Sequence, residues 1–326
     1  PDATEIYALA LHAALPISWR AGKRPVGSLA LEVRVWPFAL PRGDGLPLLV
    51  GVDAAKAESL GAGDAGVRGA MAILADHGCR GYLTGLYPTV ELGEGGRIEV
   101  DWTRYDRLAG PYLDEAAKRL DGGASAERKA YWPMPIDDGF PPPDRFGGLG
   151  GAAYDRLMPG YARACVDHFA RRGWLAGALV LAEVAIPSGP EDYRTLHRFA
   201  GWFEGISPAV RVVVSALPES MTAYGWPGSY WEDLGRWVWG WAVPGRYFTP
   251  RPADSDGGKD RSVVWLGVDQ PPYTGSVAVG APPVMTGCLG WQAYRGKADA
   301  LWVGRRAERS EERRVGKECK SRWEPY

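Results

Sequence analysis

The chain has 326 residues, of which 46% are hydrophobic and 24% are charged, and its formal net charge is −1. This composition is globular, and the length suits one large domain or two medium ones. Because the charge is nearly balanced and no run of about 18 apolar residues occurs, neither nucleic acid nor a membrane is expected as a partner.

Residues 1–17 and 307–326 differ abruptly in composition from the rest of the chain. Both segments resemble translated sequencing-adapter read-through, which occurs at the ends of metagenomic open reading frames. We therefore expect the natural polypeptide to lie within 18–306, and both ends are excluded from the fold argument.

Residues 27–41, GSLALEVRVWPFALP, alternate apolar and polar side chains. A period of two predicts a half-buried strand. Because this strand stands apart from the pattern that follows, we interpret 18–44 as the remnant of an upstream β-domain with its linker. A barrel domain is expected in 45–306.

Short apolar runs alternate with helical patterns in the rest of the chain. The runs are 47–53, 79–86, 129–137, 177–184, 210–218, 237–244, 262–269 and 298–304. Apolar spacing predicts helices within 67–78, 161–174 and 191–203. The segment 101–120 is also helical by spacing, but its Gly110-Pro111 step predicts a break or a new helix start at Pro111.

Strands that alternate with crossover helices form a parallel sheet. Eight such strands within residues 47–304 fit an α/β fold of the (β/α)₈ TIM-like barrel type. A doubly wound open sheet is the alternative, but residues 52–66 contain neither of the glycine-rich phosphate motifs that it would need. A barrel is therefore predicted, incomplete at its C-terminal end because the chain stops at the eighth strand.

The cysteines show neither CxxC spacing nor a histidine cluster, so no metal, other cofactor or disulfide framework is predicted. They are expected to be free thiols in the core: Cys79, Cys165, Cys288 and Cys319.

Functional residues of such a barrel lie at the C-terminal ends of its strands. The candidate catalytic carboxylates there are Glu183, Asp269, Asp137 and Asp138. Glu183 follows Leu-Val-Leu-Ala, and an apolar strand end raises the pKa of a carboxyl by desolvation, as a general acid requires. Carboxylates with abundant aromatics and few histidines favour glycoside hydrolysis, in which a protonated carboxyl and a second stabilising group act together.

The chain has 15 Trp and 15 Tyr but only 7 Phe. Amphipathic rings pack in cores, and they also line sugar-binding clefts, where a flat ring covers a pyranose face. The candidate substrate-binding aromatics are Trp132, Trp226, Tyr230, Trp231, Trp241, Trp265 and Tyr273.

Structural roles compete with these assignments. A glutamate at a strand end is about as often the partner of an arginine or a turn cap. Asp53 and Asp269 could cap the loops that follow them, and Asp137-Asp138-Gly139 favours a turn. Tryptophans on barrel strands are more often packing residues, although packing explains less for the Gly/Pro-rich loop that contains Trp226.

Four stretches carry a resemblance to a known family. In chain order they are LEVRVWPFALP (31–41), IEVDWTRYDRLAGPYLD (98–114), HFARRGW followed by LVLAEV (168–184), and GCLGWQAYRGKADALWVG (287–304). Over residues 27–304 the chain resembles the catalytic domain of glycoside hydrolase family 123 and its bacterial relatives. The resemblance implies a barrel behind a β-sandwich, a secreted or periplasmic location, and β-N-acetylgalactosaminidase activity. It also implies substrate-assisted catalysis, in which the 2-acetamido oxygen of the sugar is the nucleophile.

In that family an Asp-Glu pair at the end of the fourth strand orients the acetamide and acts as acid/base. Here the pair reads Ala182-Glu183, so the acid/base is retained and the orienting carboxylate is missing. Three explanations stay open. Asp137, Asp138 or Asp269 supplies the second function, for a glycan that is N-acetylated or not; the protein is a non-catalytic carbohydrate-binding barrel; or the true pair lies elsewhere. A barrel that serves only as a scaffold is a further alternative.

Overall fold

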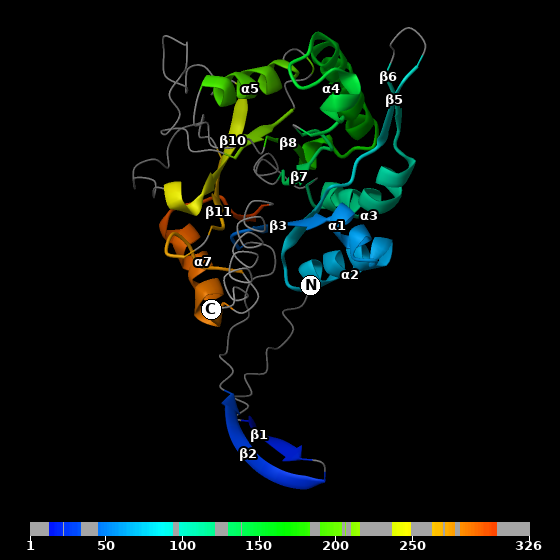
Figure 1. Cartoon of the computed structure of the whole chain (residues 1–326). Coiled ribbons are helices and arrows are strands. Elements are labelled where there is room, and N and C mark those ends of the chain that lie inside the picture. The colour runs from blue at the N-terminus through cyan, green and yellow to red at the C-terminus, as the bar shows by residue number, and fades with distance from the viewer. Residues whose placement is uncertain are drawn as a thin grey trace, which may run out of the picture. The chain divides into compact units, whose positions relative to one another are not determined.

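Figure 1 shows the computed structural model of the chain, which divides into two compact units, Pro1–Gly45 and Leu46–Tyr326. The residues that the structure describes are 13–21, 23–33, 45–93, 98–120, 130–137, 139–182, 190–203, 206, 210–215, 237–248, 263–269, 271–277 and 281–304.

The first unit contains an antiparallel pair of strands, β1 (Ala13–Ala21) and β2 (Arg24–Val33). Strand β2 contains the first part of the strand predicted at 27–41, and residues 34–41 lie outside the described part of the chain. Strand β1 begins inside the segment 1–17. The assignments of the ends to read-through and of 18–44 to an upstream domain stay predictions.

Parallel strands form the sheet of the second unit, in the order β4-β3-β12-β11-β10-β9-β8-β7. Their bounds are β3 (Leu48–Asp53), β4 (Arg80–Thr84), β7 (Trp132–Pro133), β8 (Ala178–Ala182), β9 (Val212–Val214), β10 (Val238–Pro244), β11 (Val263–Gly267) and β12 (Ala300–Val303). Each of the eight predicted runs contains one of these strands, so the α/β barrel prediction is confirmed.

The sheet is nearly closed. Strand β12 pairs with β3, which joins the last barrel strand to the first. The open junction lies between β4 and β7, which are adjacent but have no strand pairing among the described residues. Closure is therefore incomplete between the second and third barrel strands rather than at the eighth. At one end of this junction, the Arg80 guanidinium lies over the Tyr131 ring, 5.6 Å from its centroid.

The helices connect consecutive strands and surround the sheet (Figure 1). They are α1 (Ala54–Ser59), α2 (Gly63–Asp76), α3 (Thr103–Leu120), α4 (Ala152–Arg171), α5 (Pro190–Gly201) and α7 (Pro283–Arg295). The helices predicted within 67–78, 161–174 and 191–203 correspond to α2, α4 and α5. A two-stranded antiparallel pair, β5 (Thr89–Leu92) and β6 (Ile98–Asp101), follows β4 and was not expected.

The break predicted at Pro111 is wrong, because α3 runs through Pro111 without interruption. Proline in a helix interior costs about 3 kcal/mol. Buried residues on both sides of it stabilise the continuous helix: Tyr105, Leu108, Leu113 and Ala116. Pro111 itself is exposed, so its ring displaces no core side chain.

Alternation along the strands separates a face toward the helices from a face toward the barrel interior. Trp132 of β7 donates its Nε1–H to the Tyr105 hydroxyl of α3 at 3.1 Å, so Trp132 faces the helices. Its register partner Ala178 shares that face, and so does Ala182, four residues later in β8. The intervening residues Leu179 and Leu181 face the interior.

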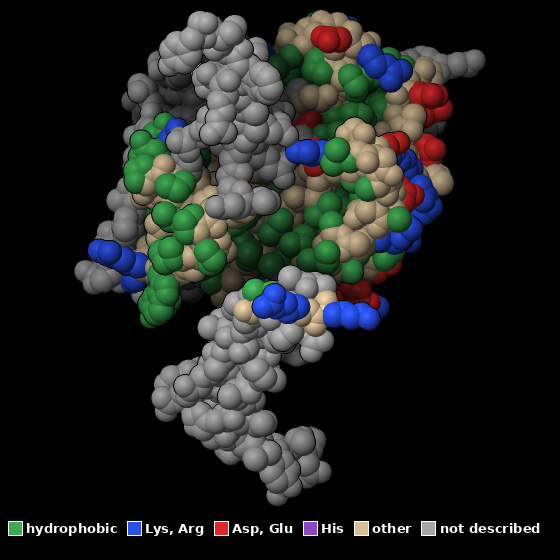
Figure 2. Space-filling model, turned by 60° about the horizontal axis from the view of Figure 1, so that its bottom comes forward, with side chains coloured by type: hydrophobic (Ala, Val, Ile, Leu, Met, Phe, Trp, Pro, Cys, Tyr) green, Lys and Arg blue, Asp and Glu red, His purple; other side chains and the backbone are tan. Residues whose placement is uncertain are grey.

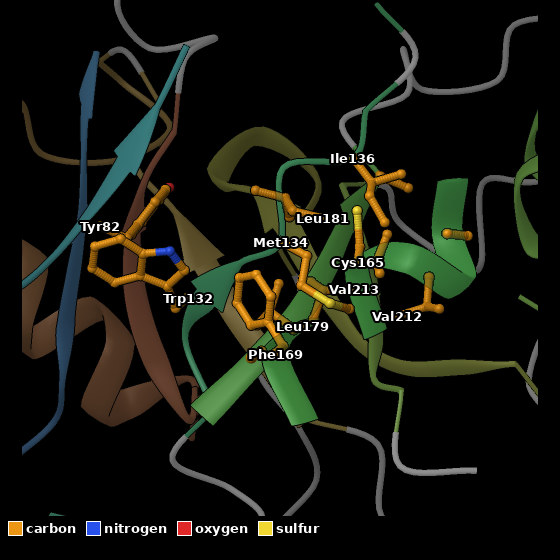
Figure 3. Packing of buried hydrophobic residues seen from close by; sticks show 14 of the residues in the cluster. Tyr82, Trp132, Met134, Ile136, Cys165, Phe169, Leu179, Leu181, Val212 and Val213 are labelled. Atoms are coloured by element: carbon orange, nitrogen blue, oxygen red, sulfur yellow. The ribbon is translucent and has the colours of Figure 1, made fainter. Parts of the chain in front are cut away.

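Figure 3 shows part of the core, in which side chains of β7, β8 and β9 pack with Cys165 and Phe169 of α4. The expectation of core thiols holds for Cys165, whose pKa is raised by burial. It is wrong for Cys288, which is exposed on α7, and Cys79 is only half-buried. Cys319 lies outside the described residues. Within the described part of the chain, no helix is long and apolar enough to cross a membrane.

Helix α7 has two apolar sides. Leu289 and Ala293 are buried against β11 and β12. Trp291 and Tyr294 are exposed, and Figure 2 shows hydrophobic side chains gathered on the surface of one face of the molecule. Because these two aromatic side chains are exposed on a helix outside the sheet, their substitution should affect neither the core nor the strand ends.

Candidate active site

The structure places several predicted site residues after the C-terminal ends of the barrel strands. Asp137 follows β7 and Asp269 follows β11, with Tyr273 four residues further on. Five predicted residues lie outside the described part of the chain: Glu183, Asp138, Trp226, Tyr230 and Trp231.

Asp137 is half-buried and lies at the open junction between β4 and β7. Its Oδ2 accepts a hydrogen bond from the hydroxyl of Tyr87, which follows β4, and its Oδ1 accepts the backbone N–H of Gly139 at 2.9 Å. The Tyr87 ring stacks on Phe140, with a centroid separation of 4.2 Å and an interplanar angle of 11°. The bond from Gly139 to Asp137 fits the turn predicted there, and the same carboxylate links the segments that follow β4 and β7, two strands with no pairing among the described residues.

Helix α4 holds the segment around Asp137 from outside the sheet. The buried Tyr161 hydroxyl donates to the Pro135 carbonyl at 2.7 Å, and the buried Tyr154 hydroxyl donates to the Pro141 carbonyl at 3.1 Å. These two bonds lie on either side of Asp137 in the sequence. Two buried tyrosines of α4 therefore help to fix the position of the Asp137 carboxylate, in addition to the turn that contains it.

Asp269 forms a bidentate ion pair with Arg246, which lies in the turn Gly245–Tyr247 directly after β10. Arg246 Nε and Nη2 donate to the two carboxylate oxygens at 2.7 Å each, and the Arg246 backbone N–H donates to Oδ2 at 3.2 Å. The Asp269 side chain is only 8% exposed. The hydrogen bond to Asp269 raises the pKa of the Arg246 guanidinium. This pair ties the loops after β10 and β11 together.

Tyr273 is 49% exposed, and Arg246 lies over its ring at 5.4 Å from the centroid. Buried Thr274 fixes the same loop, because its hydroxyl accepts the Asp269 N–H at 2.9 Å and lies 2.9 Å from the Asp269 carbonyl. Of the described candidate aromatics, Tyr273 alone presents a large ring surface to solvent.

Three candidate tryptophans are core residues, which corrects their assignment as substrate-binding rings. Trp132 and Trp241 are fully buried, and Trp265 is 3% exposed. A ring without exposed surface cannot stack on a sugar, and the chain uses these rings to fill the space inside and around the sheet.

Asp53 caps α1, because its Oδ1 accepts the Lys56 backbone N–H at 3.0 Å. The capping role considered for this residue is therefore confirmed.

We expect Asp53→Ala to lower the free energy of unfolding by about 1 kcal/mol, the usual value of an N-cap. Asp53→Asn should retain most of that stability, since its side-chain oxygen can still accept the bond. Urea unfolding of both variants checks this. A loss of stability in Asp53→Asn equal to that in Asp53→Ala would contradict the capping role.

Three residues near the strand ends were missed from the sequence: Tyr87, Arg246 and Ser215. Ser215 follows β9, its backbone N–H donates to the Ala182 carbonyl at 3.0 Å, and it is fully buried. The Ser215 hydroxyl has no hydrogen-bond partner within the described part of the chain. A polar residue one or two positions after an apolar run would have been the signal for Tyr87 and Arg246, whereas Ser215 lies inside the run 210–218 and carries no such signal. Across the described residues, no group of three His, Cys, Asp or Glu side chains is placed to hold a metal ion.

No protein-family model and no curated protein matches the sequence. Among solved structures, the chain is similar to a family 123 glycoside hydrolase from Clostridium perfringens, described for glycolipid glycan hydrolysis, with a TM-score of 0.55 and 9% sequence identity. The match covers 86% of this chain and 53% of that one, so the chain spans about half the length of that enzyme. At this identity the likeness concerns the fold, and the chain is a (β/α)₈ barrel with the fold of a family 123 glycoside hydrolase.

Proposed function

We propose that the chain is a glycoside hydrolase-like domain that acts on a glycan, with Glu183 as general acid/base and Asp137 as the second carboxylate. The observation that carries the proposal is the oriented carboxylate of Asp137 at the end of a strand, in a barrel whose fold is that of a glycoside hydrolase. In such barrels the strand ends carry the chemistry.

The phase of β8 supports Glu183 as the acid. Leu179 and Leu181 face the barrel interior, and a strand that kept this alternation for one more residue would turn position 183 to the interior as well. Ala182 has the opposite phase and is buried under the helix layer. An acidic side chain at position 182 would therefore point away from the barrel interior. We infer that the second carboxylate comes from another strand.

Asp137 suits the second role better than Asp269. Tyr87 and Gly139 each donate a hydrogen bond to a carboxylate oxygen of Asp137, which orients an acceptor and fits an anion facing a developing positive charge. Asp269 has both oxygens committed to Arg246. In the proposed reaction, Glu183 donates a proton to the glycosidic oxygen as its bond to the anomeric carbon breaks, and then takes a proton from the water that attacks that carbon. Asp137 stabilises the oxocarbenium-like state or orients a 2-acetamido group that attacks it.

Hydrolysis of a panel of 4-nitrophenyl glycosides, including the N-acetyl-β-D-galactosaminide, tests the proposal. We expect release of nitrophenol from at least one member and loss of this activity in Asp137→Asn. Saturable binding of sugars without any hydrolysis would instead support the alternative, a non-catalytic carbohydrate-binding barrel. If the protein neither hydrolyses the glycosides nor binds the sugars, the hydrolase and the carbohydrate-binding proposals both fail. The barrel would then be a scaffold.

Tyr87→Phe should lower kcat about tenfold and leave KM unchanged. The substitution removes the hydroxyl that orients Asp137 and keeps the ring that stacks on Phe140. A hydrogen bond to a charged group contributes about 1.5–3 kcal/mol, so a loss of this size in the transition state is reasonable. Tyr294→Phe, on exposed α7, is the matched control and should behave as wild type. An unchanged kcat in Tyr87→Phe would show that this bond serves the junction between β4 and β7 and has no part in the reaction.

A further inference from the structure

The loops after β10 and β11 form a rigid support around one exposed ring. Arg246 is held by Asp269 through three hydrogen bonds, and its guanidinium lies over Tyr273. Because the bidentate pair fixes the plane of the guanidinium, the ring that it contacts is held as well. An exposed tyrosine on an ordinary surface loop would not need such a support.

The packing around this support leaves little room for movement. A Cβ at Gly245 would lie 2.0 Å from Thr274 Cγ2, and a Cβ at Gly275 would lie 1.8 Å from the Met285 carbonyl oxygen. The Gly275 N–H donates to Gln292 Oε1 of α7 at 3.0 Å. Two glycines at close approaches and a bond to a helix therefore fix the loop from both ends.

Arg246 and Asp269, which hold the Tyr273 ring in place, carry opposite charges that cancel. The guanidinium of Arg246 is neutralised by Asp269 at 2.7 Å, and the Asp269 carboxylate is almost completely buried beneath it. A ring next to a neutral pair provides an apolar face with no excess positive potential. Such a surface suits an uncharged sugar better than a uronic acid or a sulfated sugar.

We propose that Tyr273 is a stacking platform for a neutral pyranose ring, and that Arg246 and Asp269 are positioning residues for this platform. The inference rests on the proposed function, because it places the platform at the strand ends where the glycan would bind. It changes the role predicted for Asp269, which supports a binding surface and does not act on the reacting atoms.

Binding of three methyl glycosides, measured by isothermal titration calorimetry, tests the platform: methyl β-D-galactopyranoside, methyl N-acetyl-β-D-galactosaminide and methyl β-D-glucuronide. Wild type should bind at least one of the two neutral sugars more tightly than the glucuronide. Tyr273→Ala should weaken that binding about tenfold, which corresponds to about 1.4 kcal/mol. Tyr273→Phe should bind as wild type, and Tyr294→Ala controls for loss of an exposed aromatic ring elsewhere.

The positioning role has its own readout. Asp269→Asn leaves the charge of Arg246 unbalanced, so the preference should shift toward the glucuronide. Arg246→Lys keeps the charge but loses the bidentate fork, and should weaken neutral-sugar binding severalfold without a shift toward the glucuronide. If either variant is poorly folded by circular dichroism, the tyrosine series alone decides.

Failure of this inference is distinguishable from failure of the proposed function. Wild-type binding by Tyr273→Ala, or tighter binding of the glucuronide by wild type, would overturn the platform while hydrolysis and its loss in Asp137→Asn could still stand. Tyrosine-dependent binding without hydrolysis would support the platform and refute the hydrolase. No binding of any of the three probes by wild type would overturn the platform.

Discussion

Glu183→Gln is expected to lower kcat about 10²- to 10⁴-fold on a 4-nitrophenyl glycoside that the wild type hydrolyses. General acid catalysis contributes about this much, and an amide cannot donate the proton that the leaving oxygen requires. Glutamine has nearly the same shape as glutamate, so substrate binding and KM should change little. The side chain is expected at the strand end, where the fold should tolerate the neutral substitution. Initial rates over a range of substrate concentrations measure both constants.

A second leaving group shows whether the loss of activity in Glu183→Gln comes from the loss of acid catalysis or from another cause. A 2,4-dinitrophenolate departs without a proton, so Glu183→Gln should retain much more activity on the 2,4-dinitrophenyl glycoside than on the 4-nitrophenyl one. Glu115→Gln is the matched control, because Glu115 is an exposed carboxylate on α3, where it pairs with Lys118. Equal losses on both substrates would point to misfolding or to a binding role. Full activity on both would remove Glu183 from the mechanism.

The fold was predictable because its signal is local. Each buried strand of a parallel barrel is a short apolar run, and all eight runs contain strands. The pattern could not show that β4 and β7 have no strand pairing among the described residues, since that depends on how far β7, only two residues long, extends beside its neighbour. Pro111 shows the opposite limit: local propensity predicted a break, and burial on both sides of the proline prevailed.

The site was less predictable, because its contacts join distant segments. Tyr87 and Asp137 are 50 positions apart and meet across a junction that no periodicity reveals. The sequence identified Asp269 as both a possible catalyst and a possible cap, and only the position of Arg246, 23 residues earlier, shows how its carboxylate is used. Composition indicated an excess of tryptophan but could not tell which rings are exposed. Among the candidate rings that the structure describes, the three buried tryptophans lie on strands, and the exposed ring is a tyrosine in a loop.

Trp132→Ala should lower the free energy of unfolding by about 3–5 kcal/mol, the range for removing a large buried aromatic. Trp132 is fully buried, and its Nε1–H is paired with Tyr105, so the substitution leaves both a cavity and a hydroxyl without its donor. Trp132→Phe keeps much of the volume and should lose less, about 1–3 kcal/mol, chiefly from the unpaired hydroxyl. Urea unfolding followed by circular dichroism measures both variants.

The activity of Trp132→Phe decides between packing and substrate binding. As a core residue, Trp132 contacts no sugar, so the folded variant should keep the KM of wild type. Trp291→Ala is the control for tryptophan removal: Trp291 is 76% exposed on α7, and the change in stability should stay within about 0.5 kcal/mol. A KM that rises severalfold in Trp132→Phe with little loss of stability would reverse the conclusion. It would require the ring to reach the glycan, and hence a β7 that moves away from α3 when substrate binds.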